Sequence, residues 1–117
     1  NVGFLKMDGG SVFKHAVKNI SSAITDALVN NNMSIKDVDW FVPHQANSRI
    51  LDAVSKKIGI DNDKIIVTVD KHANTSAASI PLALCEAVSI NKIKSGDIVL
   101  LAAMGGGFTW GSSIIRW

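Results

Sequence analysis

The stretch IVLLAAMGGGFTWGSSIIRW, residues 98–117, decides the fold class of this chain. Its first part, residues 98–103, is entirely apolar, which predicts a strand within a buried sheet. Three consecutive glycines at 105–107 break this strand, and residues 109–117 can then fold back as an antiparallel strand. We therefore expect the chain to end in two strands joined by a glycine-rich turn.

The rest of the chain alternates between helix and strand patterns. Apolar spacing and turn residues predict helices at 11–30, 48–58 and 79–90, strands at 40–42 and 65–69, and a polar loop at 70–76. Ser11 is the expected N-cap of the first helix, and Gly59 is expected to end the second. Strands separated by crossover helices pair in parallel. The sequence therefore predicts an α/β fold with a mixed, mostly parallel sheet of about four to five strands and helices on its faces.

Length and composition narrow the classes of function. The 117 residues suffice for one domain, and a net charge of +2 does not indicate a nucleic-acid partner. No apolar run is long enough for a membrane span, and the first residues lack both a Met and a secretory pattern, so we expect the chain to begin within a longer protein. The single cysteine, Cys85, excludes an intrachain disulfide and disfavours a structural metal site. A reducing, cytoplasmic location fits best.

Three loops that follow strand ends carry the residues best suited to chemistry. In an open parallel sheet, ligands bind beyond the carboxyl ends of the strands, so these loops should meet at one edge. His44 can exchange a proton near neutral pH, Asn74 can direct an amide at an oxyanion, and glycines 105–107 leave backbone amides open to close approach. Each has a structural alternative: a hydrogen-bonding histidine, an asparagine cap or turn, and a tight glycine turn.

The motifs in these loops resemble the C-terminal half of the β-ketoacyl-acyl-carrier-protein synthase III family. They are VPHQAN at 42–47, NTSAAS at 74–79 and GGGFTWG at 105–111. The resemblance implies that residues 1–117 form a thiolase-like half-unit of an enzyme that works as a homodimer without a cofactor or metal. It also implies an acyltransferase that initiates fatty acid synthesis. In that family a cysteine takes an acyl group from acyl-CoA, and decarboxylated malonyl-acyl-carrier protein attacks the thioester.

The same resemblance implies roles for three residues. His44 and Asn74 match the histidine and asparagine that hydrogen-bond the malonyl thioester oxygen during decarboxylation. Gly106 matches a glycine whose amide belongs to the oxyanion hole of the acyl-cysteine. Position 74 is an asparagine, which resembles the Cys-His-Asn arrangement of this branch of condensing enzymes. The elongating synthases have a second histidine at the matching position.

The nucleophile that such a site needs is missing. Cys85 falls within the predicted helix 79–90, away from the three loops, and we expect it to pack in the core. The family's cysteine begins a helix in the N-terminal half, so this chain alone should not catalyse condensation. Two alternatives remain open: a related polyketide-starter synthase, and a non-catalytic module that binds a CoA or carrier-protein thioester.

Basic residues lie on the two helices nearest the proposed site. Arg49 and Lys56 are seven residues apart and so lie about 20° apart around the helix axis. The resemblance matches four basic positions to the surface that receives the acidic acyl carrier protein: Arg49, Lys14, Lys56 and Lys57. The alternative is a solvated helix face that Asp52 partly neutralises.

Four further residues match positions that line the pantetheine channel of the family: Gly9, Phe13, Ala46 and Asn47. Two of them have structural alternatives. Asn47 can be the N-cap of the helix that follows it, and Phe13 can belong to the core.

Overall fold

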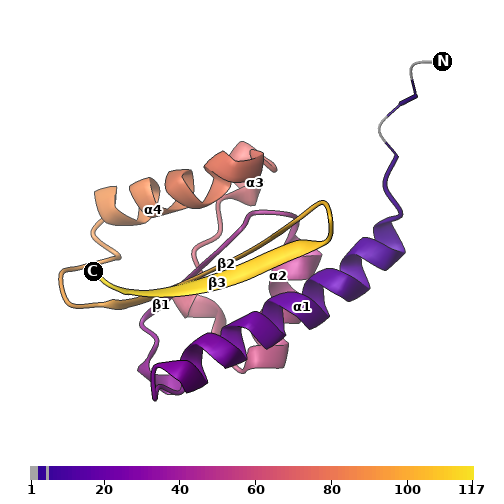
Figure 1. The fold of residues 1–117 in the computed structure, drawn as a ribbon. Coiled ribbons are helices and arrows are strands. Elements are labelled where there is room, and N and C mark those ends of the chain that lie inside the picture. The colour runs from indigo at the N-terminus through magenta and orange to yellow at the C-terminus, as the bar shows by residue number, and fades with distance from the viewer. Residues whose placement is uncertain (1–2, 5) are drawn as a thin grey trace.

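A three-stranded sheet lies at the centre of the fold in the computed structural model, which describes residues 3–4 and 6–117 (Figure 1). The strands are β1 (Trp40–Pro43), β2 (Ile98–Gly105) and β3 (Thr109–Arg116), in the order β1-β2-β3. β1 pairs with β2 in parallel, and β2 pairs with β3 antiparallel. The returning strand predicted after the glycines is therefore confirmed.

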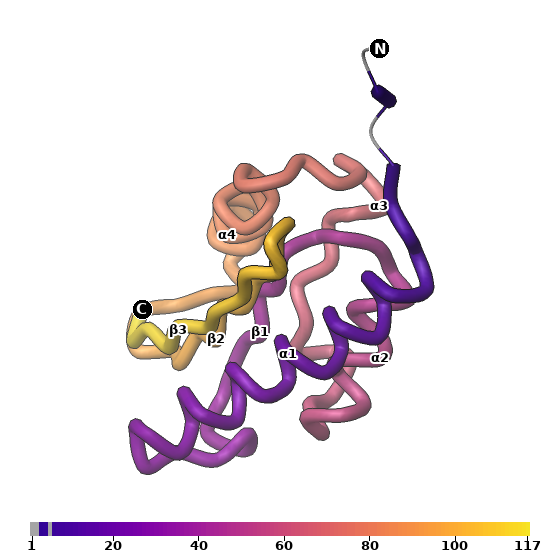
Figure 2. The backbone as a smooth tube through the Cα atoms, turned by 45° about the vertical axis from the view of Figure 1, so that its right-hand side comes forward, coloured from indigo at the N-terminus to yellow at the C-terminus, as the bar shows by residue number. Residues whose placement is uncertain are grey.

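Helices cover both faces of this sheet. α1 (Gly9–Asn30) and α2 (Ser48–Ile58) lie on one face, and α4 (Ser79–Ser89) lies on the other, as Figures 1 and 2 show. The short α3 (Val69–His72) precedes α4. Over the described residues, no helix combines the length and the apolar character that a membrane crossing requires. The predicted α/β class, with helices on the faces of a mixed sheet, is confirmed.

Strand residues alternate between the two covered faces. Phe41 and Leu100 pack with residues of α1 and α2, whereas Val42 and Val99 pack with residues of α4. All four side chains have an exposed fraction of 0%. Because both faces are covered, neither set of alternating positions has to be polar, which explains the unbroken apolar run in β2.

The helix ends follow local capping rules, with one correction. α1 begins at Gly9 because the Asp8 carboxylate accepts a hydrogen bond from the Ser11 backbone N–H at 3.2 Å. The N-cap is therefore Asp8, and the prediction of Ser11 was wrong. α2 has the predicted bounds and ends at Gly59, whose φ of 74° favours glycine.

The predicted strand at 65–69 is wrong, so the sheet has fewer strands than expected. Ile65 forms a single parallel bridge with Phe41, and the Ile66 N–H donates to the Phe41 carbonyl at 2.9 Å. The next backbone donors then turn away from β1. The N–H groups of Thr68 and Val69 donate to the side chain of Gln45, and α3 begins at Val69, the last residue of the predicted strand, and continues into the predicted loop.

Cys85 lies on α4 but is exposed, so the prediction that it packs in the core is wrong for this chain. It is also absent from the lining of the cavity at the strand ends. The described residues therefore place no cysteine beside His44.

Candidate active site

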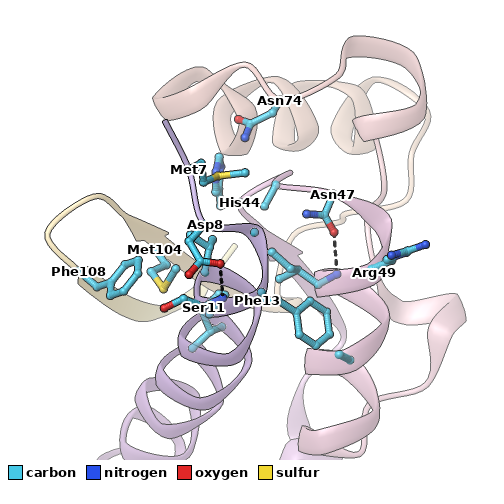
Figure 3. Close-up of a pocket in the computed structure, with 18 of the residues that line it drawn as sticks. Met7, Asp8, Ser11, Phe13, His44, Asn47, Arg49, Asn74, Met104 and Phe108 are labelled. Carbon is cyan, nitrogen blue, oxygen red and sulfur yellow. Dashed lines mark hydrogen bonds between the residues drawn. The ribbon is translucent and has the colours of Figure 1, made fainter. Parts of the chain in front are cut away.

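The three predicted loops border one cavity of about 1310 Å³ at the carboxyl ends of β1 and β2. The cavity lies between the first turns of α1 and α2, the loop that carries Asn74, and the tip of the β2–β3 hairpin (Figure 3). Its lining includes His44, Asn74 and Gly106. The structure thus brings together the residues that the sequence assigned to one sheet edge.

His44 is held by the strand and by a buried serine. Its backbone N–H donates to the Ala102 carbonyl at 2.8 Å, which extends the pairing of β1 with β2 by one residue. Its ring Nδ1 lies 2.6 Å from the hydroxyl oxygen of Ser79, the first residue of α4. The same oxygen accepts the Gln45 N–H at 3.2 Å. Ser79 is 1% exposed, so this contact is shielded from water.

The contact with Ser79 favours one tautomer of His44. Ser79 has one hydroxyl hydrogen, and its oxygen already accepts the Gln45 N–H. Donating that hydrogen to His44 Nδ1 satisfies the serine and leaves the ring proton on Nε2. Burial also lowers the pKa of His44 below its ordinary value, which favours the neutral ring at pH 7. His44 therefore offers the cavity a neutral Nε2–H donor.

Asn74 uses half of its carboxamide to shape its own loop. Its Oδ1 accepts the Ser76 backbone N–H at 2.9 Å, so the turn interpretation is confirmed. The preceding residue, Ala73, has a φ of 56°, a conformation that costs a residue other than glycine about 1–3 kcal/mol. Because the turn uses only Oδ1, the Nδ2 amide stays available as a donor to the cavity that Asn74 lines.

The glycine-rich tip of the hairpin leaves room for a ligand. A Cβ at Gly106 would meet no atom within 4 Å, so another molecule can approach this backbone closely. The neighbouring Phe108 stacks on His15 of α1, with ring centroids 4.8 Å apart. This stack holds the hairpin tip against α1 at the edge of the cavity.

The four residues predicted for the pantetheine channel all line the cavity: Gly9, Phe13, Ala46 and Asn47. Asn47 is also the N-cap of α2, because its Oδ1 accepts the Ile50 N–H at 2.9 Å. Phe13 is 37% exposed, so the alternative that it belongs to the core is wrong.

Two of the four predicted docking residues line the cavity, and the other two lie outside it. Arg49 and Lys56 line the cavity together with Asp52, whereas Lys14 on α1 and Lys57 on α2 are exposed outside it. No ion pair within residues 3–4 and 6–117 involves any of these four basic residues. Their charges are therefore available to a partner.

Sequence reasoning assigned no role to two buried polar residues beside His44. Ser79 contacts the ring, and Gln45 joins β1 to the segment before α3. Both lie inside motifs that were singled out for other residues, and a glutamine two residues after a buried strand was the available signal. In the part of the chain that the structure describes, no three His, Cys, Asp or Glu residues are grouped to hold a metal ion.

The fold and the site first define a class: an α/β half-unit of the thiolase-like fold. The whole chain superposes on 3-oxoacyl-[acyl-carrier-protein] synthase III from Aquifex aeolicus with a TM-score of 0.96 and 42% identity, covering 38% of that chain. For the enzyme from Pseudomonas aeruginosa the TM-score is 0.95 at 35% identity, over 100% of this chain and 37% of that one.

The chain belongs to the family described as 3-oxoacyl-[acyl-carrier-protein (ACP)] synthase III C terminal, whose family model matches residues 28–117. It is 55% identical over 116 residues to the beta-ketoacyl-[acyl-carrier-protein] synthase III of Rhodospirillum centenum, and 59% identical over 116 residues to that of a Bradyrhizobium species. Each match covers 99% of this chain and 36% of the relative. The chain thus spans about a third of the length of these curated relatives, and the resemblance seen in its motifs is confirmed.

Proposed function

We propose that the full-length protein is an acyltransferase that initiates fatty acid synthesis by joining an acyl-CoA starter to malonyl-acyl-carrier protein. The observation that carries this proposal is that His44 and Asn74 line the same cavity, while His44 Nδ1 contacts Ser79 and Asn74 Oδ1 is used within its own turn. The names of the relatives support the same reaction class. Residues 1–117 are proposed to form one C-terminal domain, and the catalytic cysteine comes from the N-terminal half.

The proposed reaction proceeds in two stages. The cysteine thiolate first displaces CoA from acyl-CoA and forms an acyl-cysteine thioester. The malonyl thioester then loses carbon dioxide, and the electron pair of the broken C–C bond gives an enolate. Its carbon attacks the acyl-cysteine carbonyl, which forms the β-ketoacyl-carrier protein and releases the thiolate. His44 and Asn74 stabilise the enolate oxygen by donating two hydrogen bonds to it.

Other cavity residues serve the substrates. The Gly106 amide is proposed to stabilise the oxyanion formed when the acyl-cysteine is attacked, because the space beside this backbone is open. The pantetheine arm is proposed to lie along the residues near the first turns of α1 and α2 that line the cavity: Gly9, Phe13, Ala46 and Asn47.

A condensation assay on the full-length protein tests this function. With acyl-CoA and malonyl-acyl-carrier protein, we expect a β-ketoacyl-carrier protein and one carbon dioxide per product, both measured by mass spectrometry and isotope release. Product formation without any carbon dioxide release would contradict the proposed mechanism. Tight thioester binding without turnover would support the non-catalytic binding module, which is favoured only by the absence of a cysteine from the lining of the cavity.

A polyketide-starter synthase is the second enzymatic candidate. The priming β-ketosynthase of the R1128 polyketide pathway superposes with a TM-score of 0.89 at 32% identity, covering 94% of this chain and 33% of that one. Its reaction would use the same donors, and the difference would lie in the starter group. Competition between starter acyl-CoA substrates in the condensation assay distinguishes the two.

The acyl carrier protein is proposed to dock on the basic residues around the cavity: Arg49, Lys14, Lys56 and Lys57. In the full-length enzyme, Arg49→Glu is expected to raise KM for malonyl-carrier protein on the order of tenfold, because it replaces attraction by repulsion. Steady-state kinetics at low and high salt measure the effect, and salt should narrow the difference.

Lys36→Glu is the matched control for docking. Lys36 precedes β1 and therefore lies at the opposite end of the sheet from the cavity. The same charge change there should leave KM unaltered. Equal effects of both variants would show that net charge matters and that no docking surface exists at Arg49.

The enzyme is further proposed to be cytoplasmic and to work as a homodimer. The single cysteine of this chain supports a reducing compartment, and the family resemblance supports the dimer.

A further inference from the structure

Gln45 is the most completely hydrogen-bonded buried side chain beside the cavity. It is 0% exposed, and its Nε2 donates to the Pro43 carbonyl at 2.9 Å and to the Ile66 carbonyl at 3.1 Å. Its Oε1 accepts the N–H groups of Thr68 at 2.8 Å and Val69 at 3.0 Å. A carboxamide has two donor hydrogens and one oxygen with two lone pairs, so every bonding capacity is used.

The oxygen of Gln45 caps a helix that belongs to another part of the chain. Thr68 is the N-cap of α3, but its own side chain makes no capping hydrogen bond. Gln45 supplies the acceptor instead, from 23 residues earlier in the sequence. α3 then ends at His72, two residues before Asn74. The start of the segment that carries Asn74 is therefore held by the residue next to His44.

The other end of the same segment is held by Gln45 again, through its backbone, and by His44. Ser79 accepts the backbone N–H of Gln45 and contacts Nδ1 of His44, and it begins α4 directly after the Asn74 loop. Figure 3 shows the Asn74 loop lying over His44. The segment 69–78, which includes Asn74, is thus held by Gln45 at its start and lies directly before Ser79, which contacts both His44 and Gln45.

We propose that Gln45 is a positioning residue that fixes the Asn74 amide relative to the His44 ring, so that both donors reach one substrate oxygen. The proposal rests on the proposed function and adds a residue that does not itself touch substrate. Loss of the Gln45 carboxamide leaves two carbonyls and two N–H groups without their partner and frees the start of α3. A shift of about 1 Å in a catalytic group can lower a rate on the order of 10²-fold.

The test separates the two half-reactions in the full-length enzyme. Gln45→Met keeps the length of the side chain but removes all four hydrogen bonds. We expect the rate of malonyl-carrier-protein decarboxylation to fall on the order of 10²-fold, because this step needs both donors in place. Acylation of the cysteine by acyl-CoA does not use the pair and should stay within about twofold, as measured by intact-protein mass spectrometry.

Gln45→Glu is the conservative variant. It keeps the acceptor oxygen and, while protonated, can still donate one hydrogen bond. Its decarboxylation rate should lie between those of the wild type and Gln45→Met. The rate should fall further as the pH rises, because an ionised carboxylate would face the carbonyls of Pro43 and Ile66. This pH slope still tests the proposal if Gln45→Met does not fold.

Trp40→Phe is the matched control for general destabilisation. It removes one hydrogen bond, from the Trp40 ring N–H to Asp97 at 3.0 Å, at the end of β1 that is remote from the cavity. Both half-reactions should stay unchanged in this variant. A parallel fall of both half-reactions in Gln45→Met, or a wild-type decarboxylation rate in that variant, would overturn the proposal.

Amide hydrogen exchange distinguishes failure of this proposal from failure of the proposed function. If the wild-type enzyme did not decarboxylate malonyl-carrier protein, the proposed function would be wrong. Exchange at Thr68 and Val69 would still test the positioning contact, because both amides donate to Gln45. Faster exchange there in Gln45→Met, which lacks the acceptor oxygen, supports the contact, and unchanged exchange contradicts it.

Discussion

His44→Ala in the full-length enzyme is expected to lower the rate of malonyl-carrier-protein decarboxylation by about 10²–10³-fold, the usual cost of removing one preorganised oxyanion donor. The physical reason lies in the Ser79 contact, which leaves the ring proton on Nε2 as the donor to the cavity. Release of labelled carbon dioxide measures the rate. Acylation of the cysteine by acyl-CoA should persist, because the proposed role of the donor is confined to the malonyl thioester.

His72→Ala is the control for loss of a histidine near the Asn74 loop. His72 lies at the end of α3 with its Nε2 4.0 Å from Glu86, and it does not line the cavity. We expect both half-reactions to be unchanged in this variant. A wild-type rate of decarboxylation in His44→Ala would show that His44 has no role in this step, whatever the condensation assay shows.

The location of the candidate site at one edge of the sheet could be predicted from the sequence, because it follows from the direction of the strands alone. The apolar run of β2 and the short apolar β1 indicated strands, and parallel pairing then placed their carboxyl ends together, with Pro43 opposite Ala102. His44 and Gly106 follow those ends and had to be close in space. Local chemistry also predicted the end of α2, since Gly59 adopts a positive φ.

The error at residues 65–69 shows where such reasoning fails. Ile65 and its neighbours have strand-forming side chains, and one bridge to β1 does form. The pairing stops because the Gln45 side chain takes the backbone donors of Thr68 and Val69. A hydrogen bond between a side chain and a backbone 23 residues away has no periodic signature in a sequence. The same contact explains why the role of Gln45 was missed.

Phe13 lines the cavity as predicted, and the core alternative fails for a geometric reason. Helical spacing places Phe13 on the apolar stripe of α1, which predicts burial. The buried residues of α1 begin only at Ala16, because the first turns of the helix extend beyond the sheet (Figure 1), where Phe13 lines the cavity. An apolar position at a helix end that overhangs its sheet lines a cavity, and the length of the overhang depends on how the helix docks.

Asn74→Asp in the full-length enzyme is expected to lower the decarboxylation rate on the order of 10³-fold, more than the roughly 10²-fold loss expected for Asn74→Ala. The turn should survive the aspartate, because a carboxylate oxygen can accept the Ser76 N–H as Oδ1 does at 2.9 Å. The Nδ2 donor is lost, and a negative charge takes its place where the proposed enolate develops. Alanine removes the donor without adding that charge.

Which of the two variants has the lower decarboxylation rate distinguishes two possible roles of Asn74. If the residue acted only by shaping its loop, aspartate would preserve the turn and the rate, and alanine would be the more damaging change. If the Nδ2–H stabilises the enolate, aspartate must be the more damaging change, because repulsion adds to the lost donor. Carbon dioxide release by both variants, compared at equal acylation of the cysteine, decides between these orders. An Asn74→Asp enzyme faster than Asn74→Ala would assign the asparagine to the turn alone.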